Sequence, residues 1–180
     1  ITDYNNFIPS VSILSNFKNM SSINLGYTQR IQRPGIWQLN PFEDTNGIFI
    51  QTGNADLKPV LNHNFDLSYN VSKKGSITAG LSYSFANNII QRVSTLGGMK
   101  KDTTYTTFEN IGKNKNWGVN LNTNYPFTKK FSVNINARIS YLWINGFVNK
   151  EFIKNEGFQG NAYANSSYKF DKDWRAGVNA

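Results

Sequence analysis

Polar and apolar residues alternate along most of this 180-residue chain. The clearest stretch is WGVNLNTNY at residues 117–125, where Trp117, Val119 and Leu121 share one parity. Successive side chains of a β-strand point to opposite faces of a sheet. The stretch therefore predicts a strand with one apolar face and one small, uncharged polar face. The same alternation recurs almost everywhere, whereas long helical periodicity is almost absent, so the pattern indicates an all-β protein.

The pattern predicts about eight strands, centred on residues 8–17, 22–32, 61–71, 76–90, 104–125, 131–147, 158–170 and 174–180. The stretch at 112–116 is a candidate break in the fifth strand, because it contains a glycine. Several predicted strands exceed the ~5–6 residues usual in soluble sheets and suit the ~9–11 residues of a tilted membrane strand.

The predicted connections alternate in length. Short ones fall at 17–22, 72–76, 126–131 and 170–174, and long ones at 33–60, 90–103 and 148–157. Short turns at one end and long loops at the other are typical of a transmembrane antiparallel up-and-down β-barrel. The predicted fold is therefore about eight strands of such a barrel, with residues 1–180 as a single segment.

Aromatic residues gather near the short connections: Phe17, Tyr69, Tyr125, Phe127, Phe131, Tyr168, Phe170 and Trp174. Aromatic rings at the lipid–water boundary form girdles around membrane barrels, so we interpret these residues as one girdle. The alternative is that aromatic side chains simply suit strands.

Alternation alone does not say which face is inside, because a one-sided soluble sheet and a membrane barrel are each apolar on one face. Here the polar parity carries Asn, Ser, Thr and Gly, whereas exposed soluble strands usually carry Lys and Glu. Burying unpaired amides in a dry core would cost a few kcal/mol each, so a hydrated lumen is favoured. The residues expected to face it are Asn120, Asn122, Asn124, Asn134, Asn136 and Arg138.

Charged residues make up only 17 % of the chain, with a net charge of +8. An anionic partner is conceivable, but the lysines lie in predicted turns and form no stripe interleaved with aromatics, so no nucleic-acid partner is predicted.

The chain has no cysteine, which excludes a disulfide scaffold and thiolate chemistry. It starts ITDYNN and ends WRAGVNA in mid-pattern, so we expect a piece of a longer polypeptide without its signal peptide.

Catalytic chemistry finds little support in the sequence. His63 is the only histidine, no nucleophile elbow accompanies it, and zinc sites of the usual His/Cys kind cannot form. His63 is expected to be a polar residue of the surface or lumen. Glu43 and Asp44 are adjacent and fit a loop better than a paired carboxylate site. No catalytic residue, metal ligand or cofactor is predicted, and the protein is not expected to be an enzyme.

The longest predicted loop contains three prolines and three glycines between Arg33 and Leu61. Its apolar residues Trp37, Leu39 and Phe42 are expected to pack it down into an ordered conformation. Two motifs stand out in and before it. The first comprises Arg30, Arg33, Pro34, Trp37, Leu39, Asn40, Pro41 and Phe42, and the second comprises Gly53, Asn54, Asp56, Leu57, Lys58 and Pro59.

These two motifs resemble the barrel of TonB-dependent outer-membrane receptors, in particular the Bacteroidota outer-membrane β-barrel family. The opening FIPSVSIL and the stretch FENIGKNKNWGVNLN resemble further strands of that family. Ala55 and Val60 depart from its usual Pro and Glu. The resemblance implies that the motifs are structural and lie on the extracellular side.

The resemblance also implies a bacterial outer-membrane location, contact with membrane lipid, a nutrient ligand that the sequence does not identify, and a TonB complex reached through an N-terminal region with a plug. The function expected from it is ligand uptake across the outer membrane. Two alternatives stay open: an outer-membrane barrel that acts as an anchor or as a component of a surface or secretion assembly, with a surface lipoprotein or larger assembly as partner, and a soluble lipocalin-like ligand-binding barrel with the apolar face turned inward.

Overall fold

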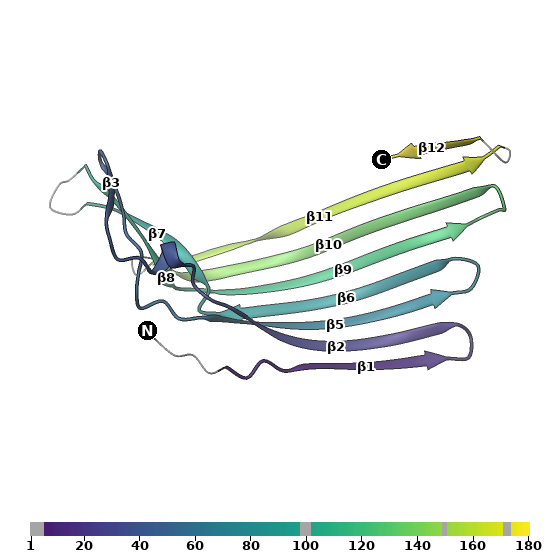
Figure 1. Ribbon diagram of the computed structural model, residues 1–180, viewed down its shortest axis with the longest axis horizontal. Coiled ribbons are helices and arrows are strands. Elements are labelled where there is room, and N and C mark those ends of the chain that lie inside the picture. The colour runs from purple at the N-terminus through teal and green to yellow at the C-terminus, as the bar shows by residue number, and fades with distance from the viewer. Residues whose placement is uncertain (1–5, 98–101, 149–150, 171–173) are drawn as a thin grey trace.

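The computed structural model describes residues 6–97, 102–148, 151–170 and 174–180, which form a large sheet and a small sheet joined at one end (Figure 1). The large sheet is antiparallel, in the strand order β1-β2-β5-β6-β9-β10-β11-β12. Its strands are β1 (Ser10–Phe17), β2 (Ser21–Gln32), β5 (Val60–Ser72), β6 (Ser76–Asn87), β9 (Lys113–Pro126), β10 (Phe131–Val148), β11 (Glu151–Lys169) and β12 (Arg175–Asn179).

Tight turns join neighbouring strands at one end of the large sheet, on the right of Figure 1, and the longer loops gather at the other end. The β1–β2 and β5–β6 hairpins close at the pairs Phe17↔Ser21 and Ser72↔Ser76. The short connection predicted at 170–174 includes residues outside the described part of the chain, whereas those at 17–22 and 72–76 are confirmed by these pairs and that at 126–131 by the pair Ser132↔Pro126. This is the up-and-down layout that the alternating loop lengths predict.

The small sheet begins where β6 and β9 bend away from the large sheet. Asn88 and Gly112 both have positive φ, of 54° and 89°, and β6 and β9 are still paired at Asn87↔Lys113. Beyond the bend the same hairpin continues as β7 (Ile90–Leu96) and β8 (Thr104–Asn110), which pair from Ile90↔Asn110 onward. The candidate break in the predicted strand 104–125 is therefore real, and the predicted strand 76–90 ends earlier than expected.

The segment between β2 and β5 completes the small sheet. It contains the short helix α1 (Ile36–Leu39) and the strands β3 (Asp44–Asn46) and β4 (Phe49–Gln51). Strand β4 pairs with β3 in antiparallel fashion and with β8 in parallel, which gives the strand order β3-β4-β8-β7. The predicted long loop is thus ordered over the sheet end, with only short elements of its own.

The prediction of a long loop at 148–157 is wrong. Strand β10 extends to Val148, β11 starts at Glu151, and the two strands pair from Val148↔Glu151 down to Phe131↔Tyr168. Residues 151–157 carry charged and polar groups on both parities, so no alternation reveals this strand. Its hydrogen-bonded pairing with β10 holds it without an apolar face.

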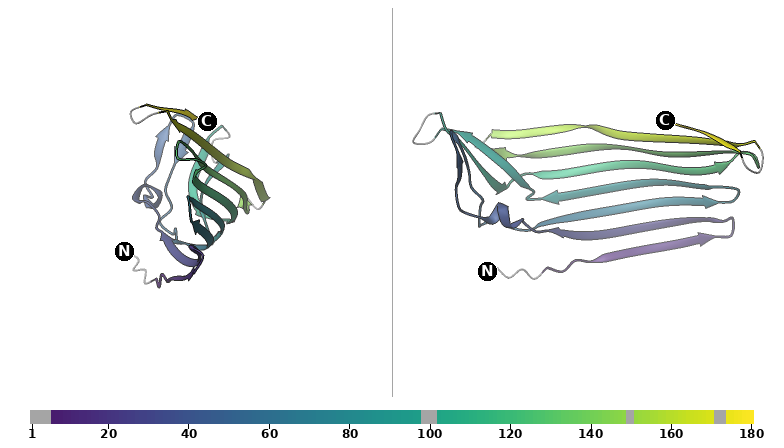
Figure 2. Two further views of the ribbon diagram at one scale, coloured as in Figure 1. Left: turned by 90° about the vertical axis from the view of Figure 1, so that its right-hand side faces the viewer. Right: turned by 45° about the horizontal axis from the view of Figure 1, so that its top comes forward.

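Buried apolar side chains lie in the small sheet and where it meets the large one: Leu57, Val60, Ala86, Ile89, Val93 and Phe108. Val60 and Ala86 pack with Ile89, and Ile90 and Ile144 contact that cluster. Val60, Ala86 and Ile144 have the same parity as the polar residues of their strands. The small sheet therefore covers one end of the polar face, and Figure 2 shows it on the concave side of the curved large sheet.

The apolar face of the large sheet is left open. Leu81, Val119 and Ile139 lie side by side on it and are 51 %, 56 % and 60 % exposed. In the described part of the chain, β1 and β12 pair with one neighbour each and not with one another. The lipocalin-like alternative is therefore wrong, because it requires a closed barrel with its apolar face inside.

Candidate functional site

The two loop motifs are joined by backbone hydrogen bonds. The Gly53 amide donates to the carbonyl of Asn40 at 2.8 Å, and the Asn54 amide donates to that of Gln38 at 2.7 Å. A Cβ at residue 53 would lie 2.4 Å from the Asn40 carbonyl oxygen. Only glycine allows the second motif to approach the first this closely.

Asn54 holds the second motif against the small sheet. Its Oδ1 accepts the amide of Asp56 at 2.9 Å, which closes a local turn, and its Nδ2 donates to the Phe108 carbonyl at 2.9 Å. Leu57, which follows this turn, is only 1 % exposed. The motif G-N-x-D-L-K-P thus encodes a turn, a bond to β8 and an apolar anchor.

Asn110, at the end of β8, completes the loop cluster. Its Oδ1 accepts the Lys58 amide at 2.7 Å, and its Nδ2 lies 2.9 Å from the carbonyls of Lys58 and Asn88. One side chain thereby ties the second motif to the bend after β6. Sequence reasoning included Asn110 only in the stretch that resembles a strand of the family and assigned it no role, although the Asn-x-Gly pattern before Gly112 was the available signal.

The apolar residues of the first motif behave differently from one another. Trp37 packs edge-on against Phe108, with 4.9 Å between ring centroids, although it remains 61 % exposed. Leu39 is half-buried, whereas Phe42 is 79 % exposed. The expectation that all three pack the loop down is wrong for Phe42, and the buried anchor is Leu57.

The six asparagine and arginine positions predicted to face a lumen share one face of the large sheet. Asn120, Asn122 and Asn124 on β9 are in register with the partners Arg138, Asn136 and Asn134 on β10. Gly80, opposite Asn120 on β6, leaves the space that this amide fills, because a Cβ there would lie 2.5 Å from its Oδ1. The face is therefore polar and built from small side chains.

A hollow of about 490 Å³ lies near the loop end of this polar face. Arg30, at the start of the first motif, and Asp66 contribute opposite charges to it, and its remaining lining residues are Thr28, Ile31, Gln32, Asn62 and Asn64. Within the described residues, the only ion pair is Lys154–Glu156. Arg30, Asp66 and Arg138 are thus charged groups of the polar face without an ion-pair partner.

Aromatic rings cluster near the tight turns of the apolar face. Tyr125 contacts Phe127 at 5.1 Å, Phe127 contacts Phe131 at 5.9 Å, and Tyr168 contacts Phe170 at 4.8 Å between centroids. Phe170 also donates its amide to the Trp174 carbonyl at 3.1 Å. Tyr69, on β5, is separated from the rings of β9 and β10 by β6.

A second set of rings, which sequence reasoning missed, crosses the same face toward the loop end. We call it the upper aromatic row: Tyr27, Phe65, Tyr83, Trp117, Tyr141 and Phe158. Ring centroids within it lie 4.8 Å apart for Tyr27–Phe65 and 4.4 Å for Tyr83–Trp117. Trp117 and Tyr141 are register partners, and Tyr141 contacts Phe158 at 4.5 Å. Each ring has the apolar parity of its own strand, but only the register aligns them.

His63 lies beside this row. Its Nδ1 is 2.9 Å from the hydroxyl of Tyr27, and its ring stacks on Phe85 at 4.6 Å. It shares the parity of Phe65 and Leu67, so it lies on the apolar face. His63 thus does not share a face with the asparagines that were predicted to line a lumen.

The residues that the structure describes contain no group of three or more His, Cys, Asp or Glu side chains placed to hold a metal ion. None of the helices in that part of the chain has the length and apolarity to span a bilayer.

Solved structures share this fold at low sequence identity. A mutant ferric enterobactin receptor of Pseudomonas aeruginosa in complex with enterobactin matches with a TM-score of 0.62 and 12 % identity, over 97 % of this chain and 34 % of that chain. The siderophore receptor PirA from Pseudomonas aeruginosa gives 0.61 and 16 %, over 97 % and 38 %. The copper transporter OprC gives 0.55 and 14 %, over 96 % and 33 %. The chain thus spans about a third of the length of these structures.

The search of curated proteins found no match. The model of the outer membrane protein beta-barrel family matches residues 1–180, the whole of the chain. Together with an antiparallel sheet that is apolar on its open face, tight turns at one end and ordered loops at the other, this match shows what the chain is. It belongs to the outer membrane protein beta-barrel family and forms part of the wall of a barrel in the bacterial outer membrane.

Proposed function

We propose that this chain is the barrel-wall segment of a TonB-dependent receptor that takes up a nutrient ligand across the outer membrane. The observation that carries the proposal is the polar face, which runs from the tight turns to a charged hollow beside the loop cluster. A wall that only anchors a protein in lipid has no need of such a face. The similarity in fold to siderophore receptors and a copper transporter supports the same function.

In this proposal the polar face lines the lumen, with Asn120, Asn122, Asn124, Asn134, Asn136 and Arg138 along it. The tight turns face the periplasm, as short turns do in outer-membrane barrels. The cluster of the two loop motifs then lies on the extracellular side, where it shapes the mouth of the barrel. It is a structural element, and the hollow with Arg30 and Asp66 beneath it is the candidate ligand contact.

The apolar face meets lipid in this arrangement. The rings near the tight turns form the periplasmic aromatic girdle: Tyr69, Tyr125, Phe127, Phe131, Tyr168, Phe170 and Trp174. The open apolar side chains between them and the upper aromatic row contact acyl chains, since their exposure to water would otherwise be unfavourable. We propose no enzymatic role for the chain, because its polar groups suit binding and passage.

The remaining parts of the receptor are proposed to lie elsewhere in a longer polypeptide. A plug within the lumen would gate passage, and a segment before it would contact the TonB complex. A surface lipoprotein or a larger assembly is a further candidate partner of the extracellular side. Residues 1–180 would then form a single barrel segment.

The test uses the full-length gene in its own host. Strains with the gene intact or deleted, each with and without TonB, are grown on single limiting sources of iron as ferric catecholate, copper, or oligosaccharide. We expect one nutrient whose uptake requires both the gene and TonB. Equal uptake of every nutrient by the intact and deleted strains would contradict transport and favour an anchoring role.

A further inference from the structure

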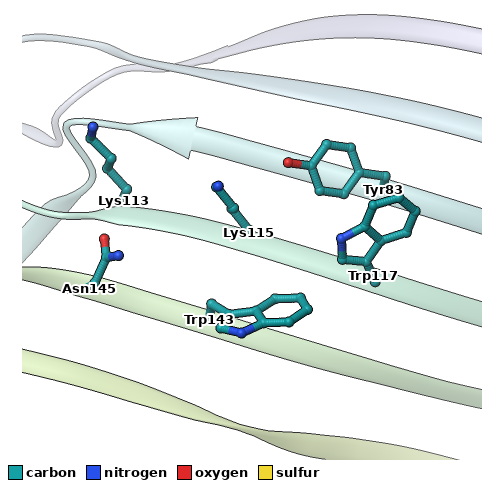
Figure 3. A pocket seen from close by; sticks show the side chains of 6 residues that line it. All are labelled: Tyr83, Lys113, Lys115, Trp117, Trp143 and Asn145. Carbon is teal, nitrogen blue, oxygen red and sulfur yellow. The ribbon is translucent and has the colours of Figure 1, made fainter.

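A second hollow, of about 460 Å³, lies on the opposite face of the large sheet from the proposed lumen. Its lining residues come from three neighbouring strands: Tyr83 from β6, Lys113, Lys115 and Trp117 from β9, and Trp143 and Asn145 from β10. Figure 3 shows Lys115 beside the indole rings of Trp117 and Trp143, with Lys113 farther along β9 and across from Asn145.

The parity of β9 fixes where these lysines lie. Lys113, Lys115 and Trp117 alternate with asparagines and share a face with Val119 and Leu121. In the sheet Lys115 stands between Phe85 and Trp143, and Lys113 between Asn87 and Asn145. Moving along this face away from the tight turns, the surface changes from aliphatic to aromatic to cationic.

The positive charge of the hollow is not neutralised by nearby carboxylates. No ion pair of Lys113 or Lys115 is present among the residues that the structure describes. The acidic group that follows Lys115 and Trp143 across the sheet is Glu156 on β11, the register partner of Trp143. Its carboxylate pairs with Lys154 at 2.9 Å. The two ammonium groups of Lys113 and Lys115 are therefore available to an anionic ligand.

We propose that Lys113, Lys115, Trp117 and Trp143 bind the phosphorylated headgroup of an outer-leaflet lipid. Acyl chains that lie against Val119 and Leu121 would bring the headgroup to the level of the lysines. Indole rings favour the boundary between hydrocarbon and headgroups. Lysine ammonium groups, on stems that lie along apolar surface, bind phosphate as compact charges, and basic pockets on membrane proteins hold lipid headgroups in this way.

The assignment to the outer leaflet rests on the proposed orientation, with the tight turns in the periplasm. The aliphatic-to-cationic order itself comes from the parity of β9 and is independent of that orientation. A lipid site here would also give a role to the two lysines that precede the apolar stretch of Val119 and Leu121 on the same face of β9. The bound lipid would seal the barrel wall just below the extracellular loops.

The test compares lipid retained by the full-length receptor after purification in detergent. Native mass spectrometry and phosphorus analysis quantify the phosphorylated outer-leaflet glycolipid per protein. The double variant Lys113→Gln, Lys115→Gln is expected to retain about tenfold less of it than the wild type, since each surface lysine contributes to anionic headgroup binding. The matched control Lys73→Gln, Lys74→Gln removes the same charge from a tight turn and is expected to retain the wild-type amount.

Heat-modifiable migration on gels verifies that each variant has folded. Equal glycolipid in all three proteins would overturn the proposal, as would equal loss in both double variants. Full displacement of the lipid by inorganic phosphate would instead indicate a general anion site and would also overturn it. Nutrient uptake by the wild-type receptor is measured in parallel. If the receptor takes up a nutrient but the two double variants retain equal glycolipid, this inference alone is overturned. If the lysines of β9 are needed for glycolipid retention but no nutrient is taken up, the proposed transport function alone is overturned.

Discussion

Individual side chains at the loop end of the sheet determine whether the loops are ordered. Gly53 allows the two motifs to meet, and Asn110 connects the second motif to the bend after β6. These residues satisfy backbone groups that no regular strand pairs, which otherwise cost free energy when they are shielded from water. Order in the loops therefore depends on a few specific contacts, and it should be sensitive to single substitutions.

The substitution Gly53→Ala should destabilise the loop cluster by about 1–3 kcal/mol, the usual cost of inserting a methyl group into occupied space. The new Cβ would overlap the Asn40 carbonyl oxygen. Hydrogen exchange of residues 52–58 in the folded receptor measures the effect. Gly157→Ala is the matched control, because no atom lies within 4 Å of a Cβ at that position. Equal exchange in the two variants would contradict the steric argument.

Removing the Asn110 side chain should loosen the second motif. Asn110→Ala leaves the Lys58 amide and the carbonyls of Lys58 and Asn88 without their partner, and each lost hydrogen bond contributes about 0.5–1.5 kcal/mol. We expect faster proteolysis within residues 33–60 by an added protease. Asn114→Ala is the comparison, since residue 114 lies on β9 outside this cluster. Unchanged proteolysis in Asn110→Ala would show that the cluster is held by other contacts.

At the scale of single elements, β9 carries most of what distinguishes the two faces. One parity of this strand supplies Asn120, Asn122 and Asn124, and the other supplies Val119 and Leu121 between two aromatic ends. Its pairing with β6 and β10 extends both faces sideways. A single residue step along β9 therefore leads from the polar face of the sheet to its apolar face.

Charge at neighbouring positions of β9 should have opposite consequences. Leu121→Arg should destabilise the protein folded in lipid by about 2–4 kcal/mol, because a cation near the bilayer midplane is costly. Asn122→Arg should be tolerated, since a hydrated lumen solvates the guanidinium group. Urea titration of receptor folded in lipid vesicles gives both values. Equal damage at the two positions would rule out the assignment of the faces.

At the scale of the whole molecule, the two ends of the curved large sheet differ in structure. The tight-turn end has short hairpins, and the loop end has a second sheet folded over the concave side (Figures 1 and 2). Buried apolar side chains are confined to that second end in the described residues. The membrane thus replaces a protein core over the length of the strands, while the loop end keeps a small core of its own.

The proposed orientation can be tested by labelling, because the chain contains no cysteine. Single cysteines are introduced at Thr45 in the small sheet and at Lys74 in a tight turn of the full-length receptor. A membrane-impermeant maleimide applied to intact cells should label Thr45→Cys and spare Lys74→Cys, and both should react after the cells are lysed. Labelling of Lys74→Cys alone in intact cells would invert the orientation.

The sequence by itself determined the two-faced strands, the tight turns and the family. Each of these is local: a period of two needs only neighbouring residues, and motifs such as R-P-G-I-W need only their own order. It also showed that Asn120 and Asn122 share a parity with each other and oppose Leu121. These features follow from backbone geometry, so no knowledge of distant contacts is required.

Tertiary structure decided the rest, because register is set by hydrogen bonding between strands distant in sequence. It aligned the rings of the upper aromatic row, and it extended β10 and β11 through residues 151–157, where no alternation marks a strand. It turned the β6–β9 hairpin out of the sheet at Asn88 and Gly112. It also placed the small sheet on the polar face, which identifies that face as the concave one.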